Sequence, residues 1–263
     1  WRWSTEFVQA HISLWNWSEI KIDGAPKHQL FLSRGAKLHT YELSSAFLEA
    51  TVNMDGSNFT SLDIHTTVLD LKEGDRLIGG IDSAQIILEI PLVMGGGDIA
   101  MVGAIEARVQ GLQIPGLSTT FLGPDISRLS FRTELFGEPP QDITPGALAV
   151  WRDLGGVIEI RHLSMDYGVL RLQTEGTMAL DGSLQPVGSL TAKVEGYAEI
   201  LNAMKASGMI SGGEALGARI VLGALSKDDP ATGIPGISIP LMIQQQTLHA
   251  GPVALIKIPT IKW

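Results

Sequence analysis

The chain has 263 residues, which is enough to bury a substantial core without disulfides or bound metal. Hydrophobic residues make up 44% of it and charged residues 18%, with 30 glycines and 13 prolines, so apolar surface is plentiful and turns are frequent. The net charge of −9 disfavours binding to nucleic acid, and the absence of cysteine excludes disulfides, thiolate catalysis and cysteine metal sites.

The N-terminal stretch is already in an alternating apolar and polar pattern, and no targeting segment precedes it. We therefore expect that the sequence is truncated at its N-terminus and that any signal or anchor segment would lie upstream of it. No run within the sequence reaches the roughly 18–20 apolar residues of a membrane-spanning helix. Tryptophans at positions 1, 3, 15 and 17 indicate either packing on a sheet face or contact with a bilayer or an acyl-bearing ligand.

Period-two alternation continues through the first half of the chain and predicts half-buried antiparallel strands. A hairpin is predicted around "DGSN" at 55–58. The "GGGD" segment at 95–98 is interpreted as a further turn, because it lacks the spacing of a phosphate-binding loop. The apolar residues of the predicted hairpin are Ala46, Leu48, Ala50, Val52 and Met54 on the first strand and Leu62, Ile64 and Val68 on the second.

Three segments are predicted to be helical, near 145–154, 197–207 and 213–226. The first has Thr144 as a suitable N-cap, Pro145 at the first helical position and Gly155 at its end. The second and third form a predicted helical hairpin, in which Ser211 and Glu214 have the spacing of a capping box.

The segment from Gly168 to Gly196 has the clearest alternation in the chain. Asp181-Gly182 lies between its two apolar runs and predicts a tight turn. Gly176 and Gly188 fall on the apolar side, which indicates strong curvature or a close approach of two backbones. The apolar row that we expect to face inward consists of Leu170, Leu172, Met178, Leu180, Leu190 and Val194.

These patterns together predict a mainly β (α+β) fold, with a large, strongly curved antiparallel sheet or groove, a short helix and a two-helix hairpin. The Pro- and Gly-containing stretch near "FGEPPQDITPG" indicates a subdomain boundary. We expect an N-terminal β subdomain over 1–140 and a C-terminal β subdomain with the helices over 141–263.

Catalytic and metal-binding signatures are weak. The sequence lacks the Gly-x-Ser-x-Gly elbow and any His-Glu-x-x-His arrangement, and its six histidines are scattered. Asp63 and His65 could share one strand face as a pair of metal ligands, but no third ligand is identifiable, so a solvated polar face is the favoured interpretation. We expect no catalytic residue, no metal site and no cofactor, and thus a protein that is not an enzyme.

Three stretches resemble a known bacterial family. They are "HISLWNWSEIKIDG", the segment that begins "GALAVWRDLGGVIEIRHLSMDYG", and the closing "GPVALIKIPTIKW". They resemble the family catalogued as domain of unknown function 2125, over nearly the whole chain and most strongly from Gly146 to Met204. The resemblance implies an envelope protein, usual in alphaproteobacteria, with an N-terminal membrane anchor and a periplasmic domain, and it transfers no catalytic residue. The repeated strands are also similar in style to AsmA-like envelope proteins, whose β grooves shield lipid acyl chains.

The leading functional hypothesis is a periplasmic protein, anchored to the inner membrane, that binds or transfers a lipid or other hydrophobic ligand. The apolar row from Leu170 to Val194 would line the ligand site, and the helical hairpin would cover it through Leu201, Met204, Leu216 and Ile220. The alternative is a non-catalytic envelope scaffold with a closed core that binds a protein partner. An apolar row carries no code for a head group, so the identity of the ligand and the oligomeric state stay open.

Overall fold

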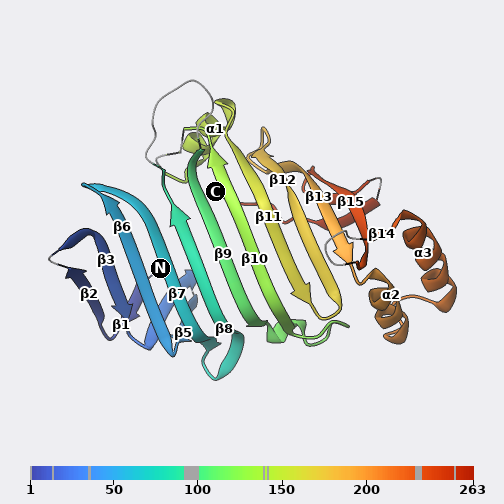
Figure 1. Cartoon of the computed structure of the whole chain (residues 1–263), viewed down its shortest axis with the longest axis horizontal. Helices are drawn as coiled ribbons and strands as arrows, with labels where there is room; N and C mark the ends of the chain where they lie inside the picture. Colours follow the sequence, from blue (N-terminus) through green and yellow to red (C-terminus); the bar gives the residue numbers. More distant parts are fainter. Residues whose placement is uncertain are drawn as a thin grey trace. The chain divides into compact units, whose positions relative to one another are not determined.

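The computed structural model describes residues 2–13, 15–34, 37–91, 101–138, 140, 142–228, 233–251 and 253–263. Most of these residues lie in antiparallel β-strands, with three α-helices and one short 3-10 helix among them (Figure 1). The predicted mainly β class is confirmed, whereas the predicted turn at 95–98 lies outside the described residues. The chain divides into two compact units: unit 1 (Trp1–Leu92 and Ile105–Ser130) and unit 2 (Val93–Ala104 and Phe131–Trp263).

Unit 1 is an antiparallel sheet that also carries the 3-10 helix η1 (Pro115–Leu117). The last two of its strands continue beyond the unit boundary. Its strands are β1 (Arg2–Thr5), β2 (Val8–Ser13), β3 (Asn16–Gly24), β4 (Lys27–Arg34), β5 (Lys37–Ser44), β6 (Phe47–Asp55), β7 (Asn58–Glu73), β8 (Arg76–Glu89), β9 (Met101–Gln113) and β10 (Asp125–Phe136).

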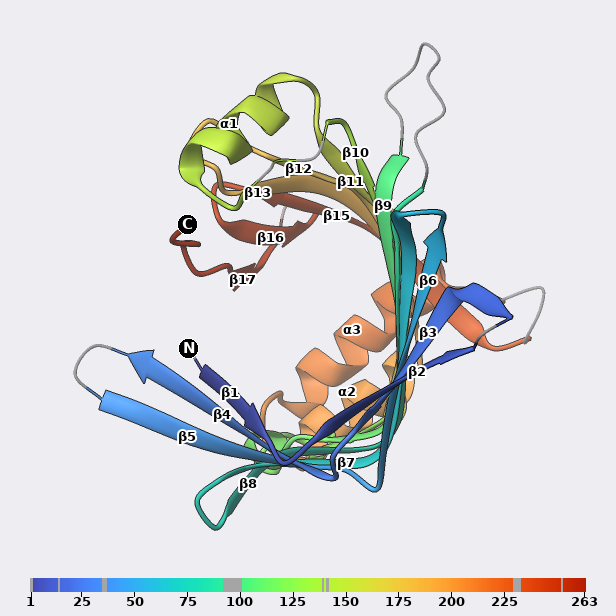
Figure 2. The same cartoon turned by 90° about the vertical axis from the view of Figure 1, so that its left-hand side faces the viewer.

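The first strands of unit 1 form two sets of pairings, and the sheet bends between them. β1 pairs with β4 while β2, the next element in the chain, pairs with β3. In the same way β4 pairs with β5 and β3 with β6, and the long strand β7 pairs with both β5 and β6. Figure 2 shows the resulting bend, at which β1, β4 and β5 turn away from β2, β3 and β6.

Small side chains are buried where the strands bend. Ala25 is fully buried, and Ser45 is 6% exposed. Backbone hydrogen bonds continue through the bend, because the Ser45 amide donates to the Pro26 carbonyl oxygen at 2.8 Å. On β7 the bend occurs at Val68, whose φ of 49° interrupts the alternation. Val68 is 60% exposed and does not join the apolar row, so the prediction that placed it there is wrong.

The apolar face of unit 1 is the inner face of this bend. Thr66 and its cross-strand partner Ala84 are buried beside the bend, at 6% and 5% exposure. Because side chains alternate between the two faces of a strand, the next cross-strand pair, Ile64 and Ile86, lies on the same face. His65, between Thr66 and Ile64, points to the other face, where its ring contacts Phe47 edge-on at 5.6 Å.

Unit 2 contains a second antiparallel arrangement. β11 pairs with β12, β12 with β13, β13 with β15, β15 with both β14 and β16, and β16 with β17. A register shift between Ile160 and Leu163 lets apolar residues on both sides of it share one face of β11. The strands are β11 (Val157–Tyr167), β12 (Leu170–Leu180), β13 (Pro186–Glu195), β14 (Lys227–Asp228), β15 (Pro235–Gln244), β16 (Thr247–Ala250) and β17 (Val253–Lys257).

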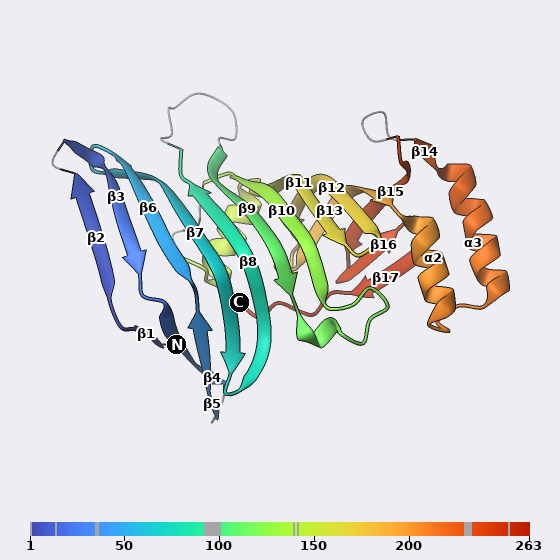
Figure 3. The same cartoon turned by 60° about the horizontal axis from the view of Figure 1, so that its bottom comes forward.

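Helices lie at the three predicted places, in unit 2. In α1 (Pro145–Asp153) the Thr144 hydroxyl accepts a hydrogen bond from the Ala147 amide, and Gly155 follows the helix with a φ of 84°. α2 (Tyr197–Ala206) and α3 (Gly212–Leu225) lie side by side (Figure 3). Ser211 and Glu214 form the predicted capping box at the start of α3.

The connection between β12 and β13 is longer than the predicted tight turn. It spans 181–185, and the Asp181 carboxylate accepts hydrogen bonds from the amides of Ser183 and Gln185 at 2.8 and 2.9 Å. These hydrogen bonds from the Asp181 carboxylate stabilise a five-residue loop in place of the predicted two-residue Asp-Gly turn. Gly176 does allow a close approach of backbones, since a Cβ there would lie 2.3 Å from the Ser189 carbonyl oxygen.

Among the described residues, no bulky side chain is completely buried. Several large apolar side chains stay exposed, including Ile86 at 41% and Ile105 at 43%.

Candidate functional site

The predicted apolar row lies on one face of unit 2. Cross-strand pairing aligns Leu172 with Val194, and Met178 and Leu180 with Gly188 and Pro186. Leu190 is the deepest member, at 9% exposure. The other members, which are Leu170, Leu172, Met178, Leu180 and Val194, are each half-buried.

One strand outside the predicted row, β15, extends it. On β15, Ile237 pairs with Val194 and Leu241 pairs with Leu190, so the apolar face continues beyond β13. Ile237 and Ile243 are among the most buried apolar residues of the chain, at 5% and 8% exposure. The alternation in "GISIPLMI" at 236–243 carried the signal for this extension.

The predicted cover residues divide into two groups. Leu201 on α2 is 9% exposed and Met204 is half-buried, so these two residues face the interior of unit 2. Leu216 and Ile220 on α3 are 61% and 65% exposed. They lie on the solvent side of the hairpin. The reason is that the small residue Ala215, at 9% exposure, occupies the packed side of α3 in their place.

Unit 1 carries a comparable apolar surface on the inner face of its bend. Ile86 on β8 is 41% exposed. On β9 the Arg108 side chain donates to Gln85, so Arg108 points to the outer face. Because side chains alternate along a strand, Ile105 points to the inner face, and it is 43% exposed. Ile12 on β2 is 53% exposed. On this inner face Ile12, Ile86 and Ile105 stay 41–53% exposed, whereas Thr66 and Ala84 are buried.

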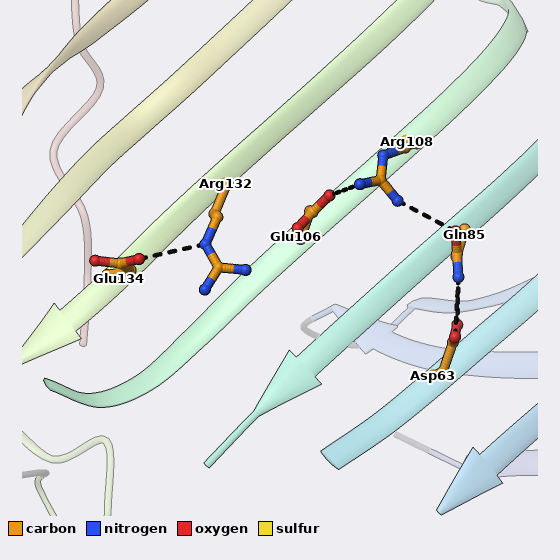
Figure 4. A network of polar contacts seen from close by, with 6 residues as sticks. All are labelled: Asp63, Gln85, Glu106, Arg108, Arg132 and Glu134. Carbon is orange, nitrogen blue, oxygen red and sulfur yellow. Dashed lines mark hydrogen bonds and ion pairs between the residues drawn. The ribbon is translucent and has the colours of Figure 1, made fainter. Parts of the chain in front are cut away.

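The outer face of unit 1 is polar and ordered by hydrogen bonds (Figure 4). The Gln85 amide donates to both carboxylate oxygens of Asp63, at 2.9 and 3.1 Å, and accepts from Arg108 at 3.3 Å. Arg108 also forms an ion pair with Glu106. Asp63 and His65 do share this face, together with Gln85, as the spacing predicted. Asp63 is held by Gln85, which is the arrangement of a solvated polar face.

A second polar cluster lies in unit 2. Glu134 accepts hydrogen bonds from Arg132 at 3.3 Å and Arg161 at 2.6 Å (Figure 4 shows the first). Burial of the carboxylate opposes its ionisation, but the two arginines outweigh this effect and lower the pKa of Glu134 below its ordinary value. Glu134 is therefore a structural anion at neutral pH.

The described residues offer few groups for catalysis. His39 lies 2.8 Å from Glu73, which is also hydrogen-bonded by Arg76. The hydrogen bonds from His39 and Arg76 lower the pKa of Glu73, which keeps it anionic. Across the described residues, no group of three or more histidines and carboxylates could hold a metal ion.

The family model described as an uncharacterized protein conserved in bacteria, DUF2125, matches residues 1–259. The chain belongs to the DUF2125 family. No curated protein and no solved structure matches this DUF2125 chain. None of its described helices is both long and apolar enough to cross a bilayer.

Proposed function

We propose that this DUF2125 chain binds a lipid or another hydrophobic ligand on the concave apolar face of a curved sheet. The observation that carries the proposal is the exposure along the inner face of unit 1, where Ile12, Ile86 and Ile105 remain 41–53% exposed. The described elements of this unit are the strands of the sheet and the 3-10 helix η1. A single-layer sheet with an apolar inner face is suited to a ligand that supplies the missing second layer.

Hydrophobic burial provides sufficient driving force for such binding. Removing apolar surface from water contributes roughly 25 cal/mol per Å². An acyl chain laid across several strands would cover half-exposed side chains without polar partners of its own. The inner face of unit 1 and the apolar row of unit 2 from Leu170 to Val194 both have this character. Function by desolvation accords with the scarcity of catalytic groups among the described residues.

The proposed setting is the bacterial envelope, with the protein in the periplasm and attached to the inner membrane by a segment outside this sequence. This part of the proposal rests on the resemblance set out in the sequence analysis. An acyl-chain carrier has a clear use in that compartment, because lipids that cross an aqueous space need their tails shielded from water.

Native mass spectrometry tests the proposal. The full-length protein is purified from its own envelope without added detergent, and its mass is compared before and after organic extraction. We expect a stoichiometric lipid that organic solvent removes. A clean mass of the protein alone, from a preparation that also fails to take up added phospholipid, would contradict the proposal.

The alternative function is a scaffold that binds another protein, and one observation favours it. All six residues of β2 (Val8–Ser13) are exposed, and the nearby Trp15 and Trp17 are 96% and 73% exposed. Tryptophan is enriched at binding hot spots. Replacing Trp15 and Trp17 by serine would abolish capture of such a partner while leaving lipid retention unchanged, so the same mass measurement separates the two functions.

A further inference from the structure

One side of helix α3 is exposed and apolar along its centre, with Arg219 at its edge. Leu216 and Ile220, four residues apart, lie on the same side of the helix and are 61% and 65% exposed. The same side continues through Gly213, Gly217 and Ala224, which are spaced three or four residues from Leu216 or Ile220. A surface helix of a soluble protein normally presents charged or polar residues to water. This face of α3 is therefore suited to a non-aqueous environment.

The opposite side of α3 is the one that the protein covers. Ala215 is 9% exposed, and Ala218 and Leu222 are half-buried. α3 contacts α2 and β15 within unit 2. The exposed face is thus the outer face of the α2–α3 hairpin.

The two charged residues of α3 are arranged differently with respect to this face. Glu214 completes the capping box, and the hydrogen bond from the Ser211 amide lowers the pKa of its carboxyl group. Arg219 is exposed, lies three residues from Leu216, and has no ion pair or hydrogen bond with any described residue. The Glu214 carboxylate is therefore hydrogen-bonded at the start of the helix, whereas the Arg219 guanidinium lies exposed beside the apolar face.

A second cation lies at the other end of the same face. The ammonium group of Lys205 on α2 would lie 3.7 Å from a Cβ placed on Gly212, which is four residues before Leu216. Lys205 is exposed and likewise unpaired among the described residues. Arg219 also lines a cavity of about 500 Å³ together with Arg171 and the two carboxylates Glu195 and Glu199. Lys205 therefore lies near the first turn of α3, and Arg219 lies next to Ile220 in the sequence.

We propose that the outer face of α3 docks on the surface of an anionic lipid bilayer. Leu216 and Ile220 enter the boundary between head groups and acyl chains, and Lys205 and Arg219 contact the anionic head groups. Cations beside an exposed apolar face are one feature of helices that lie in the membrane interface. The inference is independent of whether the sheet holds a ligand, because it concerns a separate surface of unit 2.

The composition of the face favours lipid over a protein partner. Protein interfaces are enriched in aromatic residues and arginine at their centre, where most of the binding energy lies. The centre of the α3 face instead consists of aliphatic residues, alanine and glycine, and its only arginine lies at the edge. A bilayer needs no shape complementarity, so a smooth aliphatic face with cations at its border meets its requirements.

Vesicle co-sedimentation tests this proposal with the full chain. The vesicles contain equal parts of phosphatidylcholine and phosphatidylglycerol, and vesicles of phosphatidylcholine alone serve as the uncharged comparison. The double variant Leu216→Gln with Ile220→Gln should lower the partition constant by about tenfold or more, because two aliphatic side chains no longer enter the membrane. A matched control, Ile143→Gln with Val150→Gln, changes two residues near α1 that are 74% and 59% exposed and should leave binding unchanged.

A charge variant supplies an independent measurement. Lys205→Gln with Arg219→Gln should weaken binding to the anionic vesicles by about fivefold per charge and leave binding to the neutral vesicles unchanged. Unchanged binding of the Leu216 and Ile220 variant would overturn the proposal, as would a wild-type protein that does not bind the anionic vesicles. Sedimentation velocity in the absence of lipid tests whether a second copy of the chain binds this face instead. A wild-type dimer that the Leu216 and Ile220 variant converts to a monomer would also overturn the proposal.

Discussion

Replacement of two isoleucines on the inner face of unit 1 gives the sharpest test of ligand binding. Ile86 and Ile105 retain 41% and 43% exposure in the chain. Complete burial of an isoleucine side chain contributes about 1.5–3 kcal/mol. A ligand that covers the remaining exposed fraction would therefore gain about 0.6–1.3 kcal/mol from each residue. Substitution of both by threonine, which keeps the β-branched shape but places a hydroxyl on the surface, removes much of this gain.

The double variant Ile86→Thr with Ile105→Thr should bind a fluorescent long-chain acyl probe about 5–30-fold more weakly than the wild type. Fluorescence titration measures the dissociation constant, and thermal unfolding checks that the sheet is intact. Ile87→Thr is the matched control, because Ile87 adjoins Ile86 on β8 but points to the outer face. Equal affinities for the wild type and the double variant, or an equal loss in the control, would refute the assignment of the inner face as the binding surface.

Three further outcomes concern stability. Because the hydrogen bond from Arg161 helps to hold the pKa of Glu134 below its ordinary 4.5, Glu134→Gln should lower the unfolding free energy by about 1–2 kcal/mol at neutral pH. Urea titrations at decreasing pH should show this difference vanish as the pH falls through the lowered pKa, where the wild-type carboxylate is protonated. Gly176→Ala should cost about 2 kcal/mol or more in urea unfolding, since its Cβ would meet the Ser189 carbonyl oxygen at 2.3 Å, and a cost no larger than that of an ordinary surface substitution would contradict the close approach. His28 is 3% exposed and neither ring nitrogen has a hydrogen-bond partner, so His28→Phe should raise the unfolding free energy by about 1 kcal/mol, and a loss of stability would show that the imidazole is satisfied in solution.

Local features of this fold were readable from the sequence because short-range chemistry determines them. Thr144 and Pro145 at the start of α1, and Ser211 with Glu214 at the start of α3, act within one helical turn. Alternation likewise identified the faces of β12 and β13, since a strand fixes the direction of each side chain without reference to the rest of the chain.

Features that depend on distant residues could not be read in the same way. Val68 continues the apolar alternation of Ile64 in the sequence, but a positive φ at the bend takes it out of the row. The bend itself depends on Ala25 and Ser45, which lie on other strands, and no local pattern marks it. For the candidate site, periodicity shows which side of α3 is apolar, but it cannot show whether that side faces a sheet or the solvent, and Leu216 was therefore misplaced.

The single-layer construction of unit 1 has a consequence for its cooperativity. Among the described elements of unit 1, each strand contacts its neighbours in the sheet, as β6 contacts β3 and β7, and no second layer of strands or helices covers the sheet. Stability in such an arrangement is close to a sum of nearest-neighbour terms, as in repeat proteins. A hydrophobic molecule lying across several strands would link strands that otherwise interact only in pairs. Binding of this ligand would then stabilise all the strands that it contacts at once. Without the ligand the sheet can unfold strand by strand, and with the ligand bound it would unfold as one cooperative unit.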